Sequence, residues 1–195
     1  MSKQLIRKLA VDEHWVERMS GVWRTLNHPT KHPDNPILKA DRSWEGYLAM
    51  QPGTVIYDEE DRIFKMWYNA LPSAEKPDVD NYLCYAVSED GSTWEKPELG
   101  NHEHNGSTAN NIVLRGVDWT HSVIKDDEAG PRRYKLAYWS RKGNLEGVYV
   151  AFSADGVHWV DHGQRPVVPG WASGRPAQDT LCPKSRPKLV PMSVV

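Results

Sequence analysis

Several apolar stretches of this chain carry hydrophobic residues on both faces of a strand, without polar residues at alternate positions. The clearest are the runs from Tyr82 to Val87 and from Val148 to Phe152. A sheet with one face in water alternates apolar and polar residues, so these runs predict strands that are buried on both sides. Across the chain, runs rich in β-branched and aromatic residues predict eight strands. These are Thr54–Asp58, Phe64–Asn69, Tyr82–Ser88, Thr93–Glu95, Ser122–Asp126, Tyr134–Ser140, Val148–Ser153 and His158–Val160.

The eight strands form two copies of one pattern. Val55, Ile56 and Asp58 recur 68 positions later, and Lys65 and Tyr68 recur 70 positions later. At an offset of 65, the residues that recur are Ala86, Ser88, Asp90, Gly91 and Trp94. The changes of offset fall between the matched runs, where loops are expected. Repeated four-stranded antiparallel units that are buried on both faces are typical of neighbouring β-propeller blades.

Each copy closes with an Asp-Gly turn followed by a tryptophan. The first is Ser88 to Trp94 and the second is Ser153 to Trp159. Asp-Gly supplies a side chain that caps the turn and a residue that accepts positive φ. We therefore interpret Asp90 and Asp155 as structural residues.

The fold class predicted is all-β, an incomplete propeller of four-stranded blades with about two blades present. Residues 1–50 form an N-terminal segment that leads into the propeller, 51–114 form blade 1 and its connection, and 115–165 form blade 2. Residues 166–195 are rich in proline and are either the start of blade 3 or a disordered tail. A closed ring needs at least four blades, so we expect a chain that is truncated or diverted from its proper reading near Arg175. Such a chain should associate through the open blade face or aggregate.

Composition excludes several classes of function. The 24 Lys and Arg residues against 26 Asp and Glu residues leave a net charge of −2 and no basic stripe, so nucleic acid is not expected as a partner. Charges interrupt the first 20 residues, so neither a signal peptide nor a membrane span is predicted. As written, the chain is expected to be cytoplasmic; a missing upstream leader would make it secreted or periplasmic.

No cofactor or metal site is predicted. The sequence has neither a phosphate-binding glycine loop nor a Gly-x-Ser-x-Gly elbow. His102-Glu103-His104 lies in a polar connection without further ligands, so we interpret it as a solvated loop.

The blade motifs resemble those of five-bladed propeller glycosidases, of glycoside hydrolase families 32 and 43. The resemblance lies in Phe64 to Tyr68 and Tyr85 to Trp94, with His32 to Leu38 and Trp44-Glu45-Gly46 leading into the first blade. It implies a five-bladed ring and a pair of carboxyl groups that flank a glycosidic bond. The positions that the resemblance gives to the first two acids fall within Gln51–Thr54 and Trp119–Ser122, and neither contains a carboxylate.

The candidate site residues follow from this comparison. Asp179 and Glu45 are the candidate catalytic acids, and the alternative for Asp179 is a turn or capping aspartate. The candidate substrate-binding residues are His121, Gln51, Trp44, Trp119 and Trp171. The alternative for His121 is a histidine bound by backbone, and for the tryptophans it is packing between blades.

The predicted function is that of a glycoside hydrolase-like, carbohydrate-active propeller that hydrolyses glycosidic bonds, with this piece inactive alone. The alternative is a non-catalytic carbohydrate-binding or scaffolding propeller. The absence of carboxylates from both blade positions favours the alternative, and the blade motifs favour the hydrolase.

Overall fold

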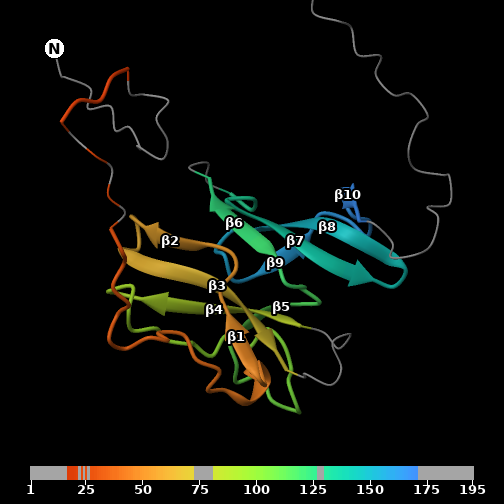
Figure 1. The fold of residues 1–195 in the computed structure, drawn as a ribbon. Helices are drawn as coiled ribbons and strands as arrows, with labels where there is room; N and C mark the ends of the chain where they lie inside the picture. The colour runs from red at the N-terminus through yellow and green to blue at the C-terminus, as the bar shows by residue number, and fades with distance from the viewer. Residues whose placement is uncertain are drawn as a thin grey trace, which may run out of the picture. The chain divides into compact units, whose positions relative to one another are not determined.

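Among the residues that the structure describes, every regular element is a β-strand apart from one short 3₁₀ helix, η1 (Ser43–Glu45) (Figure 1). The computed structural model describes residues 17–21, 23, 25, 27–72, 81–126 and 130–170. No helix within these ranges is long and apolar enough to cross a membrane. The chain divides into two units, Met1–Asn35 and Pro36–Val195, and both sheets belong to the second. In the first unit, the Asn35 N–H donates to the His32 carbonyl to close a turn.

The first sheet, called blade 1, is antiparallel throughout. Its central strands are β3 (Ile63–Leu71) and β4 (Tyr82–Ser88). β1 (Leu48–Met50) and β2 (Val55–Asp58) both pair with the same side of β3, so together they form one interrupted inner strand. β5 (Ile112–Arg115) pairs with the other side of β4.

The second sheet, blade 2, repeats this order. β6 (His121–Lys125) pairs with β7 (Tyr134–Lys142), which pairs with β8 (Leu145–Ser153). β9 (Trp159–Asp161) and β10 (Val168–Pro169) both pair with β8 and form an interrupted outer strand. The prediction of an all-β chain with about two propeller-type blades is confirmed. The five-bladed ring stays a prediction.

The strand registers of the two blades correspond residue by residue. Val55 pairs with Met66 in blade 1, and Val123 pairs with Leu136 in blade 2, which are the positions that offsets of 68 and 70 connect. The sequence did not predict β1, β5 or β10, and the strand expected over Thr93–Glu95 is only a single bridge from Val87 to Glu95. β10 lies within the predicted third blade or tail, and residues 171–195 lie outside the described residues.

Both Asp-Gly turns are closed by their own side chains. The Asp90 carboxylate accepts hydrogen bonds from the N–H groups of Ser92 and Thr93, and Ser88 Oγ accepts one from Gly91 N–H. Asp155 and Ser153 repeat these bonds in blade 2. In blade 1, the bonds from the Thr93 and Ser92 N–H groups and from the Ser88 hydroxyl hold the pKa of Asp90 at about 2. The structure agrees with the interpretation of both aspartates as turn residues.

One apolar core joins the two blades, and the indole of Trp67 lies at its centre. Trp67 is fully buried and packs against Tyr134 and Trp159 of blade 2, with ring centroids 5.9 Å and 6.4 Å away. Its Nε1–H donates to the Gly156 carbonyl oxygen at 2.7 Å. The blades therefore share side chains that neither blade buries alone.

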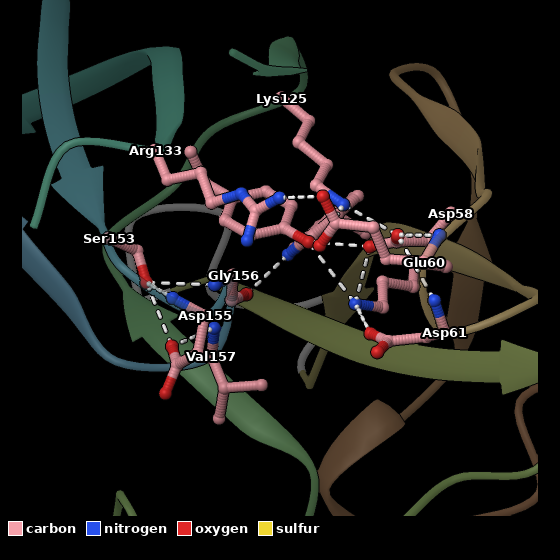
Figure 2. A network of polar contacts seen from close by, with 12 residues as sticks. Asp58, Glu60, Asp61, Lys125, Arg133, Ser153, Asp155, Gly156 and Val157 are labelled. Carbon is pink, nitrogen blue, oxygen red and sulfur yellow. Dashed lines mark hydrogen bonds and ion pairs between the residues drawn. The ribbon is translucent and has the colours of Figure 1, made fainter. Parts of the chain in front are cut away.

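A charged network lies beside this core (Figure 2). Asp58 of blade 1 is 1% exposed and accepts hydrogen bonds from Lys65, from Lys125 and from the hydroxyl of Tyr134. Burial alone would raise the pKa of Asp58, but the bonds from Lys125, Lys65 and Tyr134 outweigh it and hold the pKa well below its usual value. Since Lys125 and Tyr134 belong to blade 2, the network fixes the register of one blade on the other.

The far face of blade 2 is open. β7 alternates buried residues with residues that are partly or fully exposed, and Ile124 of β6 and Val160 of β9 are 57% and 71% exposed. The corresponding face of blade 1 is covered by blade 2. Self-association through this open face stays a prediction.

The two turn glycines allow a matched test of the interface. Gly91 and Gly156 both have positive φ, but a Cβ on Gly156 would lie 2.8 Å from Trp67, whereas one on Gly91 would lie 3.6 Å from Phe64. We expect Gly91→Ala to cost about 1–2 kcal/mol from backbone strain alone. Gly156→Ala should cost about 1–3 kcal/mol more, because it also overpacks the inter-blade core. Urea unfolding measures both, and equal losses would contradict this interface.

Candidate functional site

Two predicted binding residues, Gln51 and His121, meet at one backbone carbonyl. The Gln51 side-chain amide donates to the Trp67 carbonyl oxygen at 3.0 Å, and His121 Nε2 lies 2.8 Å from the same oxygen. Gln51 follows β1, and His121 begins β6 in the other blade. The inner-strand residues expected to face a cavity therefore bind to the scaffold and hold the two inner strands together.

The His121 ring is fixed on every side. It is 6% exposed, and its Nδ1 lies 3.0 Å from Asn69 Oδ1. The Asn69 amide nitrogen donates to the carbonyls of Val117 and Asp118, so the amide oxygen must face the ring. A Cβ on Gly53 would lie 2.3 Å from the ring, so only glycine fits there. Both ring nitrogens thus face acceptors.

Glu45, a candidate catalytic acid, lies in a separate buried network with Trp44. It is fully buried; its Oε1 accepts from the Tyr68 hydroxyl at 2.6 Å and lies 2.6 Å from Lys96 Nζ. The N–H groups of Asp41 and Arg42 donate to its Oε2 at 2.8 and 2.9 Å. Four donors therefore surround this carboxylate, and a substrate could reach it only if this packing opened.

Trp44 belongs to the same network through Asn111. Its Nε1–H donates to Asn111 Oδ1 at 2.7 Å, and the Asn111 amide donates to the Tyr68 hydroxyl at 2.7 Å. Burial, together with the nearby Cys84 and Glu45, raises the pKa of Tyr68 far above its usual value. Trp44 also packs on the apolar cluster of blade 1 that contains Met66 and Cys84.

A charged group made of one exposed and two half-buried side chains lies at the beginning of the inner strand of blade 2. Arg141 Nε is 3.8 Å from Asp118 Oδ2 and 3.5 Å from Glu146 Oε1. Trp139 Nε1–H also donates to Glu146 at 3.3 Å. We call Asp118, Arg141 and Glu146 the Arg141 cluster. Within the described ranges, no group of three or more His, Cys, Asp or Glu side chains is placed to hold a metal ion.

The tryptophan that follows Asp118 is exposed. Trp119 has 52% of its surface accessible, and the Asp118 N–H preceding it donates to the Trp139 carbonyl at 2.8 Å. Sequence reasoning missed the Arg141 cluster, because its window for the blade-two acid began at Trp119, one residue after Asp118. Trp171 and Asp179 lie outside the described residues.

Comparison with known proteins gives likeness at the level of structure only. No model of a protein family and no curated protein sequence matches the chain. A fructofuranosidase from Schwanniomyces occidentalis is 18% identical with a TM-score of 0.43, over 62% of this chain and 24% of its own.

Two further solved structures are similar to the same extent. One, described for the GH130 family of mannoside phosphorylases, is 15% identical over 60% of this chain and 32% of its own, with a TM-score of 0.40. The other, from Parabacteroides distasonis, is 22% identical over 59% of this chain and 32% of its own, also with a TM-score of 0.40. The chain thus spans a quarter to a third of these proteins. With identities this low and TM-scores below 0.5, the blade assignment rests on this chain's own strand order and register.

Titration of His121 tests its packing. Burial lowers the pKa of His121 from its usual value of 6.5, against the opposing effect of the Trp67 carbonyl. The unfolded chain then binds a proton on His121 before the folded chain does, so the free energy of unfolding should fall as the pH drops below 6.5. Asparagine does not titrate, so the difference in free energy of unfolding between wild type and His121→Asn should be constant above that pH. Below it, wild type should lose stability relative to the variant. Urea unfolding of both proteins across this range measures it, and the opposite trend would show that the two acceptors raise the pKa instead.

Proposed function

We propose that this chain is a glycoside hydrolase-like, carbohydrate-active protein that binds a glycan beside Trp119 and the Arg141 cluster. The observation that supports this most directly is the exposed indole of Trp119, which directly follows Asp118 of the Arg141 cluster in the sequence. Indole faces offer apolar surface to the C–H groups of a sugar ring, and a polar edge close by can bind its hydroxyls. A planar guanidinium and two carboxylates supply several donors and acceptors in fixed directions.

Hydrolysis of glycosidic bonds is the finer part of the proposal, with Asp179 and Glu45 as its candidate acids. Such chemistry needs two carboxyl groups at the two sides of the bond, one protonated and one ionised. Glu45 has four donors around it, so in this role it would have to exchange at least one of them for substrate.

A non-catalytic carbohydrate-binding propeller is the second candidate function. It is favoured by the residues at the inner-strand positions for which the resemblance implies acids. Gln51 and His121 both bind the Trp67 carbonyl there, so they contribute to the scaffold and offer no acid. In this reading the chain recognises a glycan and leaves it intact.

Titration with oligosaccharides tests the binding proposal on the whole chain. Suitable probes are fructosylnystose, the ligand of the fructofuranosidase structure, and β-1,2-linked mannobiose, within a panel of other linkages. We expect Trp119→Ala to weaken binding about tenfold, because a lost stacking contact is worth roughly 1.4 kcal/mol. Trp23→Ala is the matched control, since Trp23 is 81% exposed and should leave affinity unchanged. Binding that survives Trp119→Ala, or no binding across the panel, would refute a site at Trp119.

Release of reducing sugar from any glycan that binds distinguishes the two candidate functions. Hydrolysis that Glu45→Gln or Asp179→Asn abolishes would identify that residue as necessary for the reaction. Binding without turnover favours the non-catalytic alternative. Turnover unchanged in both variants would remove both residues from the chemistry.

A further inference from the structure

An apolar pocket of about 340 Å³ lies on blade 1, on the side of β2 and β3 away from blade 2. Val55, Phe64 and Met66 line it from these strands, and the turn after β4 adds Gly91 and Trp94. The segment around Leu38 closes part of it. Val55 is 46% exposed, so the pocket opens to solvent at this edge.

Gln51 also lines the pocket, and the other five lining residues of blade 1 have counterparts in blade 2 at the offsets of the repeat. The strand registers confirm the correspondence of β2 and β3 with β6 and β7, and of β4 with β8. The counterparts of Val55, Phe64, Met66, Gly91 and Trp94 are Val123, Tyr134, Leu136, Gly156 and Trp159.

In blade 2 these counterparts form an occupied socket. Tyr134 and Trp159 contact the Trp67 ring, and the Gly156 carbonyl accepts its N–H. Val123 and Leu136 belong to the same buried cluster as Trp67. Gly156 is required because a Cβ there would lie 2.8 Å from the indole. The set is thus built around an indole that the preceding blade supplies.

The pocket of blade 1 retains the groups of this socket that bind an indole. Gly91 has a φ of 74°, close to the 81° of Gly156, so its carbonyl belongs to a turn of the same shape. Trp94 Nε1 is buried and has no hydrogen-bond partner in the described part of the chain, whereas Trp159 Nε1–H donates to the Gly156 carbonyl at 3.0 Å.

The charged half of the inter-blade contact is not repeated. Phe64 replaces Tyr134 and has no hydroxyl, and Tyr57 replaces Lys125 and has no charge. An occupant of this pocket therefore needs an aromatic side chain but no buried carboxylate equivalent to Asp58.

We propose that this pocket is a docking site for a tryptophan on the second strand of another propeller blade, which inserts as Trp67 inserts into blade 2. The indole N–H donates to the Gly91 carbonyl, and the ring packs between Phe64 and Trp94. A second copy of this chain does not supply the occupant through Trp67, because that residue is fully buried in its own core. An apolar cavity of about 150 Å³ binds benzene, so 340 Å³ accommodates an indole ring.

Binding of N-acetyl-L-tryptophanamide and of indole to the whole chain tests the proposal by NMR. We expect saturable shifts of the Gly91 amide and of the Trp94 indole signal, with a Kd on the order of 1 mM for so small a ligand. Val55→Trp fills the open edge and should abolish these shifts. Val160→Trp is the matched control, because Val160 is also exposed but lies on blade 2 outside the pocket. An unchanged chemical shift of the Leu136 amide shows that each variant is folded.

Three results would overturn the proposal. The first is the absence of saturable shifts at ten times the expected Kd, and the second is shifts that Val55→Trp leaves intact. The third is free tryptophan binding much more tightly than its blocked amide, which would make the pocket a metabolite site.

A further variant supplies a positive control. In Trp67→Ala, indole should also change the chemical shift of the Gly156 amide, since that variant empties the equivalent socket in blade 2.

Discussion

The contact between the two blades depends on one residue of blade 1, Trp67, which binds through both its side chain and its backbone. Its indole enters blade 2 beneath the Gly156 turn, and its carbonyl oxygen binds Gln51 and His121. Burying a tryptophan removes about 150–250 Å² from water, which stabilises the joined blades by roughly 4–6 kcal/mol. The Asp58 network adds little to this apolar term, because dehydrating its charges offsets much of their attraction. Its contribution is to specify how blade 2 lies on blade 1.

This arrangement separates the polar residues into two groups. Glu45, Asp58, Asn69 and His121 are buried and bind partners from distant parts of the chain, so they hold the inner strands and the turn from Asp41 to Glu45 in place. Trp119 and Arg141 are exposed on blade 2, and Asp118 and Glu146 beside Arg141 are half-buried. The rigid group supports the exposed one, and this is why the exposed edge is the better candidate for recognition.

The sequence was most informative where structure is local. The long strands and the Asp-Gly turns follow from residues a few positions apart. The repeat offsets compare such local runs between the two copies, and the strand registers agree with them. β1 and β10 are short pieces of interrupted strands, and β5 pairs with β4 across a register shift between Leu83 and Cys84, so no local pattern marks them.

The site was harder to predict for a related reason. The partner of Gln51 and His121 is a backbone carbonyl, which carries no sequence signal, and Glu45 meets Lys96 across 51 positions of sequence. Asp118 adjoined the expected window, but only the pairing of its N–H with Trp139 reveals that the inner strand begins there.

Native-state hydrogen exchange of Trp67→Phe tests most directly whether the two blades form one cooperative unit. The account predicts that this change in blade 1 lowers the protection of the Leu136 amide in blade 2 and of the Tyr85 amide in blade 1 by the same amount, roughly 1–3 kcal/mol. Loss of protection at Tyr85 with none at Leu136 would show that the blades open independently, and would contradict the shared core.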